Sequence, residues 1–349
     1  MTNPAVDLVI AMHRRIERRR MVALLGLLLL LGGLMVLDIA TGPALLPISD
    51  VLATLAGPAE ADMTLRAIVW DLRLPMALMA LTVGVALGTS GATMQTLLDN
   101  PLASPYTLGL AAAAGFGAAL CIQNGGWGLN PSFIVPFCAF VMACLAAATI
   151  YGVGNIRGMG TDTMVLAGIA LLFMFHSLQS LLQFRATPEV GQQIVFWLFG
   201  SLAKATWTSV QITALACLIA VPLLMREAWK MTALRLGEQR ARALGVNIVW
   251  LRFVTIALIS FMTATAISFV GTIGFIGLVA PHLSRLLVGE DQRFLLPLSG
   301  LVGALLLSAA SVISKILMPG VLVPVGIVTA VVGVPFFMHL ILSRRRLAL

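Results

Sequence analysis

Residues that could carry out chemistry are few and scattered in this sequence. Four cysteines lie in or at the ends of apolar runs without the spacing of metal ligands, so we expect buried free thiols and no metal site: Cys121, Cys138, Cys144 and Cys217. His176 is the one titratable side chain deep in an apolar run, where either a packing role or a proton relay would suit it. Paired carboxylates, a nucleophile elbow and a zinc motif are missing from the sequence. We therefore predict no catalytic residue and a protein that is not itself an enzyme.

The sequence also lacks a means of powering transport by itself. Lys204, Lys230 and Lys315 are not followed by Ser or Thr, and the glycines of a phosphate loop do not precede them. Asp and Glu are absent from the middle of every apolar run, where an ion-coupled carrier usually places an ionisable group. We expect no cofactor on this chain, and any uphill transport would need a partner that supplies the energy.

Composition places these residues in a membrane. Of 349 residues, 60% are apolar and only 10% are charged, which lies far from the soluble globular range. A membrane-spanning helix needs about 20 apolar residues, and continuous runs of that kind exclude a transmembrane barrel. We predict an all-α, polytopic single domain over 1–349 with about ten spanning helices, the first of them retained and not a cleaved signal. The runs are 21–39, 75–93, 106–123, 131–152, 163–184, 205–225, 247–268, 272–289, 294–314 and 324–343.

The distribution of Lys and Arg predicts the orientation. With ten helices and the N-terminus inside, 17 of the 22 basic residues fall on the cytoplasmic side. The remaining five fall outside: Arg66, Arg73, Arg185, Lys204 and Lys315. Both termini, the segment 1–20 and the loop 226–246 are therefore expected in the cytoplasm. This topology and anionic lipid headgroups account for the net charge of +8, so a nucleic-acid partner is not implied.

Two outer segments and several glycines add local expectations. A short surface helix is expected near 48–56, and the aromatic segment 192–199 is too short to span and should lie at the interface. Glycines recur at close-packing intervals: Gly84, Gly88, Gly115, Gly117, Gly271, Gly274, Gly277, Gly300 and Gly303. They favour either ordinary helix packing or a bundle that must move.

The segment 236–245 is unusual because it is charged, helix-forming and flanked by long apolar runs. Its leucines and alanines make a narrow apolar strip, while Glu238 and Arg240 belong to a polar face. Gly245 can end the helix in the left-handed conformation. We interpret this segment as a binding surface for another protein, the alternative being a solvated loop.

Four ordered blocks of sequence resemble the permease subunits of ATP-binding-cassette importers for iron-siderophores, haem and cobalamin, the FecCD-type, type II importers. The blocks comprise Arg73-Leu74-Pro75 with Gly84, Ser90-Gly91, Gln95, Asn100 to Pro105 and Leu108-Gly109; Gly237-Glu238 with Ala241 and Leu244-Gly245; Gly274 to Val279 with Pro281-His282 and Arg285; and Pro324 to Thr329 with Gly333 and Pro335. The resemblance covers nearly the whole chain. Met76 departs from the family pattern, which has an arginine there.

The resemblance implies a permease dimer around a central translocation pathway, two ABC ATPase subunits in the cytoplasm that bind ATP and Mg, and a periplasmic or lipid-anchored binding protein outside. The implied coupling helix comprises Gly237, Glu238, Arg240, Ala241, Leu244 and Gly245. The implied cytoplasmic gate comprises Asn100, Pro101, Leu102, Thr161 and Asp162, although such a turn is also ordinary helix punctuation. The implied docking cations for the binding protein are Arg66, Arg73 and Lys315, for which contact with lipid headgroups is the alternative.

These implications give a function. We expect a multi-pass permease of the bacterial inner membrane that imports a bulky metal chelate by alternating access. A ferric siderophore is the expected cargo, with cobalamin or haem as alternatives. The alternative class is a stand-alone secondary carrier or channel, against which the lack of midplane carboxylates counts. The partner permease would be a second copy or a paralogue.

Overall fold

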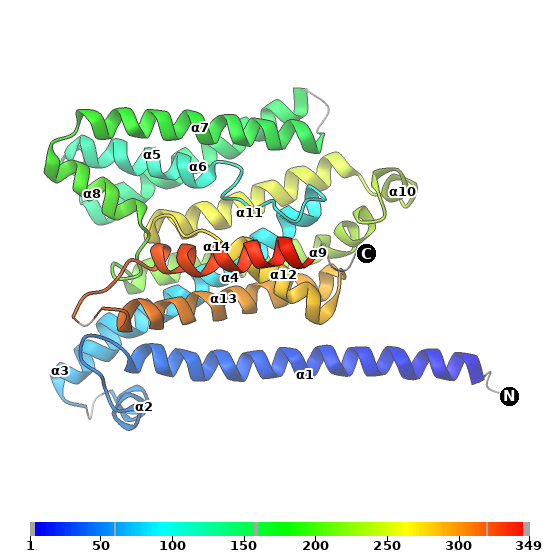
Figure 1. Ribbon diagram of the computed structural model, residues 1–349, viewed down its shortest axis with the longest axis horizontal. Coiled ribbons are helices and arrows are strands. Elements are labelled where there is room, and N and C mark those ends of the chain that lie inside the picture. The colour runs from blue at the N-terminus through cyan, green and yellow to red at the C-terminus, as the bar shows by residue number, and fades with distance from the viewer. Residues whose placement is uncertain (1–3, 59–60, 157–159, 319, 345–349) are drawn as a thin grey trace.

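The computed structural model describes residues 4–58, 61–156, 160–318 and 320–344, which form a bundle of long helices (Figure 1). Residues 1–3 of the predicted N-terminal segment and Arg157, Arg345 and Arg346 of the charge count lie outside the described residues. The helices are α1 (Pro4–Ala40), α2 (Ile48–Ala56), α3 (Met63–Arg66), the π-helical η1 (Ala67–Arg73), α4 (Leu74–Leu97), α5 (Leu110–Gln123), the 3₁₀ turn η2 (Gly125–Gly128), α6 (Pro131–Ile156), α7 (Thr161–Arg185), α8 (Pro188–Leu198), α9 (Trp207–Leu234), α10 (Glu238–Ala243), α11 (Ile248–Val270), α12 (Ile276–Val288), α13 (Gln292–Ile316) and α14 (Val325–Arg344).

Each of the ten predicted apolar runs overlaps with a helix, although the run 106–123 is helical only from Leu110, and the predicted surface helix near 48–56 is α2. Among the described residues, seven helices are long and apolar enough to cross a bilayer, and three shorter apolar helices cover Leu110–Gln123, Ile276–Val288 and Val325–Met338. The predicted run 272–289 becomes helical only from Ile276, because Gly271 and Phe275 adopt left-handed backbone angles, φ 77° and 66°. Non-helical backbone inside a membrane must be surrounded by protein. Ile273, in this non-helical segment, is accordingly buried in the core.

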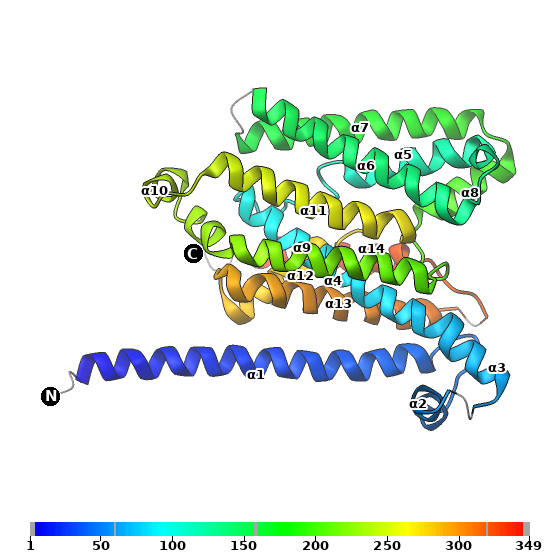
Figure 2. The same cartoon turned by 180° about the vertical axis from the view of Figure 1, so that it is seen from behind.

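Two ends of the bundle can be distinguished in Figures 1 and 2. One end carries α10, the beginning of α1 and the end of α14, and we call it the α10 end. The opposite end carries α2, α3 and α8, and we call it the α8 end. Most of the long helices run between these ends, with α7 along one side of the bundle and α1 along the other.

Helix α4 forms the centre of the bundle and packs on α13, α12, α11 and α9. Glycines let its backbone touch its neighbours: a Cβ added to Gly88 would lie 2.1 Å from the carbonyl oxygen of Ser299 in α13. A Cβ added to Gly91 would lie 1.9 Å from the carbonyl oxygen of Gly277 in α12. The prediction of close helix packing at Gly84, Gly88, Gly277 and Gly303 is confirmed, since backbone contacts of this kind need residues without side chains.

Candidate functional site

The segment between α9 and α11 forms the short helix that its sequence predicts. Gly237, with φ 97°, precedes α10, and Gly245, with φ 82°, follows it. The N–H of Val246 donates to the carbonyl of Ala241 at 3.0 Å, and the N–H of Gly245 donates to the carbonyl of Arg242 at 2.9 Å. These two bonds make the Schellman closure in which the left-handed residue ends the helix. The predicted left-handed ending at Gly245 is therefore confirmed.

The faces of α10 are used differently. Ala241 is fully buried and holds the helix against the bundle. Arg240 is exposed, and Leu244 keeps 66% of its surface in solvent although it is a large apolar residue. Glu238 instead turns toward α11, where its carboxylate lies 2.5 Å from the guanidinium of Arg252. The exposed face with Arg240 and Leu244 is thus the part of the predicted coupling helix that is open to a partner.

Arg252 connects α10 to the start of α7. Its side chain is only 4% exposed, and its Nη2 lies 3.5 Å from the hydroxyl oxygen of Thr161, a predicted gate residue. The neighbouring gate residue Asp162 is exposed in the first turn of α7. Because Arg252 is removed from solvent, its contacts with Glu238 and Thr161 are less screened than those of a surface ion pair.

A second group of charges joins the predicted gate turn after α4 to the end of α9. Arg235, the residue after α9, contacts the carboxylate of Asp99 and also Glu290, at 3.3 Å. Glu290 in turn lies 3.2 Å from Nε of Arg285 in α12, whose guanidinium also donates to the side-chain oxygen of Gln95 in α4. The turn between α4 and α5 is therefore connected by side chains to both α9 and α12.

A side-chain hydrogen bond stabilises the predicted gate turn. The amide oxygen of Asn100 accepts a hydrogen bond of 2.9 Å from the N–H of Leu102, which is an Asx turn. Pro101 and Leu102 are exposed at the α10 end. Each of the two predicted gate segments is thus linked to the region of α10 by a different arginine. Arg235 contacts Asp99, the residue before Asn100, and Arg252 contacts Thr161.

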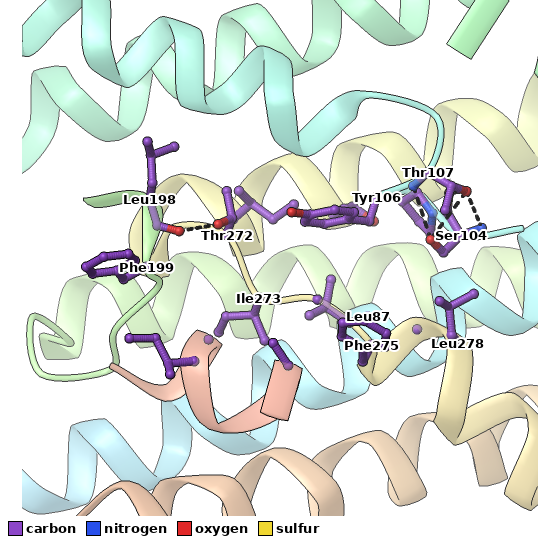
Figure 3. Close-up of a pocket in the computed structure, with 18 of the residues that line it drawn as sticks. Leu87, Ser104, Tyr106, Thr107, Leu198, Phe199, Thr272, Ile273, Phe275 and Leu278 are labelled. Carbon is purple, nitrogen blue, oxygen red and sulfur yellow. Dashed lines mark hydrogen bonds between the residues drawn. The ribbon is translucent and has the colours of Figure 1, made fainter. Parts of the chain in front are cut away.

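A cavity of about 540 Å³ lies between the loop after α4, the end of α8, the loop before α12 and the start of α14 (Figure 3). Two of its hydroxyls donate to backbone carbonyls: that of Thr107 to Ser104 at 2.9 Å and that of Thr272 to Leu198. The buried hydroxyl of Thr263, which also lines the cavity, has no hydrogen-bond partner among the described residues. None of the described residues that line it carries a charge. The lining residues are Leu87, Ser104, Pro105, Tyr106, Thr107, Leu198, Phe199, Thr263, Ile267, Thr272, Ile273, Gly274, Phe275, Gly277, Leu278, Gly326, Ile327, Ala330 and Val331.

The sequence did not predict this cavity, although it singled out several of the residues that line it. Three of the sequence blocks that carry the family resemblance contribute to its wall, namely Ser104-Pro105, Gly274-Phe275 with Gly277-Leu278, and Gly326-Ile327. Nothing in their separate positions indicates that they meet. Within the described part of the chain, no group of three or more His, Cys, Asp or Glu side chains is placed to hold a metal ion.

The three predicted docking cations have different surroundings. Arg66 is exposed near the α8 end, as expected of a docking residue. The structure corrects the prediction that Arg73 and Lys315 are exposed for docking, because both side chains are buried against the end of α1. Lys315 Nζ lies 2.8 Å from the Asp38 carboxylate, and Arg73 donates to the carbonyls of Ile39 and Ala40 at 2.8 and 2.9 Å. Those carbonyls belong to the last turn of α1, where intrahelical partners are missing, so the two cations cap that helix.

Known proteins resemble the chain over most of its length. It is 33% identical over 327 residues to the Fe(3+)-citrate import system permease protein YfmE of Bacillus subtilis, covering 94% of this chain and 96% of the relative. It is 35% identical over 279 residues to the vitamin B12 import system permease protein BtuC of Citrobacter koseri, covering 80% and 84%. It is 33% identical over 329 residues to the molybdate import system permease protein MolB of Haemophilus influenzae, covering 93% and 96%.

A solved structure and a family match agree with these relatives. The structure is described as an inward-facing conformation of a metal-chelate type ABC transporter. It superposes with a TM-score of 0.81 at 30% identity, over 92% of this chain and 99% of that one. Residues 27–343 match the FecCD transport family. The chain therefore belongs to the FecCD transport family and is a permease of an ATP-binding-cassette importer.

Proposed function

We propose that this permease imports a metal chelate by alternating access, driven by ATPase subunits that bind the exposed face of α10. The observation that carries the proposal is the division of α10 into a fixed and a free face. Ala241 and Glu238 attach the helix to the bundle, whereas Arg240 and Leu244 are exposed. Arginine is enriched among the residues that dominate protein–protein binding, and the exposed leucine beside it offers apolar area that a partner can bury. The α10 end is then the cytoplasmic end, in a bacterial inner membrane.

The cavity supports the transport pathway in this proposal. The described residues of its wall are uncharged and mostly apolar, and the hydroxyls of Thr107 and Thr272 bond to nearby backbone. Such a wall fits a cargo whose organic shell covers the metal charge, because a bare ion would need ligands or countercharge. We infer that a dimer of this permease with a second copy or a paralogue encloses the pathway, and that each cavity contributes to it.

A ferric siderophore is the proposed cargo, with cobalamin and haem as alternatives. The binding protein that delivers it would dock at the α8 end, where Arg66 is exposed and where α2, α3 and α8 lie (Figure 1). Arg73 and Lys315 take no part in this docking, since their charges are directed to the end of α1.

Reconstitution in vesicles tests the proposal. The permease, its ATPase and its binding protein would be combined, and uptake of a ferric siderophore, cobalamin, haem and molybdate would be compared with ATP inside. We expect ATP-dependent uptake of the siderophore. Leu244→Asp should reduce ATPase co-purification and uptake at least tenfold, while the control Gln239→Ala, on the exposed part of the same helix, should change both less than twofold. Uptake that continues without the ATPase would favour a secondary carrier and overturn the proposal.

A further inference from the structure

We propose that Arg235 and Arg252 are positioning residues that transmit movement of α10 separately to the two predicted gate segments. The inference rests on the proposed function, in which α10 receives the ATPase. Arg235 lies just before α10 and Arg252 lies near the start of α11, so the two arginines flank the helix in sequence. Each one binds a different predicted gate segment, Asp99 beside Asn100 for Arg235 and Thr161 for Arg252.

The Arg252 connection is direct, and the arginine itself is buried, although Glu238 keeps 43% of its side chain exposed. Glu238 is the first residue of α10, so any displacement of α10 displaces its carboxylate, which lies 2.5 Å from Arg252. Arg252 also reaches Thr161, the first residue of α7. Helix α7 packs mainly on α5 and α6, so this hydrogen bond is a polar link from the coupling region to an otherwise separate part of the bundle.

The Arg235 connection depends on an unusual residue at the end of α4. The N–H of Asn100 donates to the carbonyl of Gln95 at 3.1 Å and the N–H of Asp99 donates to that of Thr96 at 3.4 Å, a Schellman closure with Asp99 in the left-handed position, φ 44°. Glycine is the usual residue there, and aspartate, which tolerates this conformation better than most side chains, is still less favourable than glycine. The aspartate therefore destabilises the turn relative to glycine, and what its side chain provides in return is the contact with Arg235.

The stability of the fold does not explain this arrangement. The Asp99 side chain is 82% exposed, and ion pairs with exposed partners contribute little to folding. A left-handed aspartate that holds a weak ion pair is instead suited to a contact that can break and form again. Glu290 lies 3.3 Å from the same arginine and offers Arg235 an alternative carboxylate when the turn moves away.

The test measures the number of ATP molecules hydrolysed per cargo molecule imported by the reconstituted complex. Asp99→Gly removes the carboxylate and relieves the backbone strain, so the turn should fold at least as well as before. We expect this variant, Arg235→Met and Arg252→Met each to raise the ATP-to-cargo ratio at least fivefold while ATPase binding stays within twofold of the unmodified complex. The control Lys230→Met, which removes an ion pair with Glu227 inside α9 itself, should leave the ratio unchanged.

Double variants test the two routes. Asp99→Gly combined with Arg235→Met should be no worse than Arg235→Met alone, because both substitutions break the same Arg235–Asp99 contact. Arg235→Met combined with Arg252→Met should be worse than either. The inference is overturned by single variants that keep the original ratio, or that lose ATPase binding and import in parallel. Failure of the proposed function would look different, since the unmodified complex would then show no ATP-dependent import.

Discussion

At the α8 end, Lys315 and Asp38 have 2% and 0% of their side chains exposed and contact each other at 2.8 Å. At the α10 end, Arg235 and Glu290 keep 30% and 47% of their side chains exposed and are 3.3 Å apart. Charges removed from water must stay paired, since a lone buried charge is very costly, whereas solvated charges can separate at little cost. The first pair therefore fixes α1 to the bundle, and the second belongs to a contact that can change partners.

The largest expected effect comes from breaking the buried pair at the α8 end. Lys315→Met leaves the Asp38 carboxylate buried without its cation, and we expect a loss of about 3–5 kcal/mol in the free energy of unfolding. Unfolding in detergent at several denaturant concentrations measures it. The double variant Asp38→Leu with Lys315→Met should recover most of the loss. A single variant as stable as the original protein would contradict the comparison.

Arg73 gives a smaller effect at the same end. Arg73→Met leaves the carbonyl of Ile39 without this donor, whereas the carbonyl of Ala40 still accepts from the N–H of Leu46. We expect about 1–3 kcal/mol of destabilisation for the unpaired buried carbonyl. The end of α1 should open first, so a cysteine introduced at Ile39 should react faster with a thiol reagent in this variant. An unchanged rate would show that the guanidinium does not hold the helix end.

Arg235 should matter little for stability, in contrast to Lys315. We expect Arg235→Met to cost about 1 kcal/mol or less, because its partners are exposed. High salt should remove this small difference by screening the pairs, while the stability of the Lys315–Asp38 pair should respond much less. The measurement compares unfolding curves at low salt with curves at 1 M salt, where the Debye length is about 3 Å. If Arg235→Met lowered the free energy of unfolding as much as Lys315→Met, the two ends of the bundle would not differ in how their ion pairs contribute to stability.

The smallest effect is expected at Arg66, the remaining exposed docking candidate. Arg66→Glu should slow association with the binding protein a few fold with little change in dissociation, because rim charges steer encounter. Surface-immobilised permease and soluble binding protein give both rates. Lys204→Glu, also predicted on the outer side, is the matched charge reversal. Equal effects of both reversals would indicate general attraction without a specific site.

Much of the fold was predictable because helix patterns are local. Apolar runs placed the helices, and Gly245 marked the end of α10 within two residues. The burial of Lys315 was not predictable, because its partner Asp38 is 277 residues away and a cation at a helix end looks the same in sequence whether it meets water or protein. The cavity escaped prediction for the same reason, since its wall combines residues from distant parts of the chain.

The contacts of Gly88 with Ser299 and of Gly91 with Gly277 have a mechanical consequence. Two backbones that touch leave no rotamers between them to absorb a displacement, so α4, α12 and α13 cannot shift gradually against one another. We expect these three helices to move together as one rigid body. The bending must then occur where the backbone leaves the helical conformation, at Gly271 and Phe275 on one side and at Asp99 on the other.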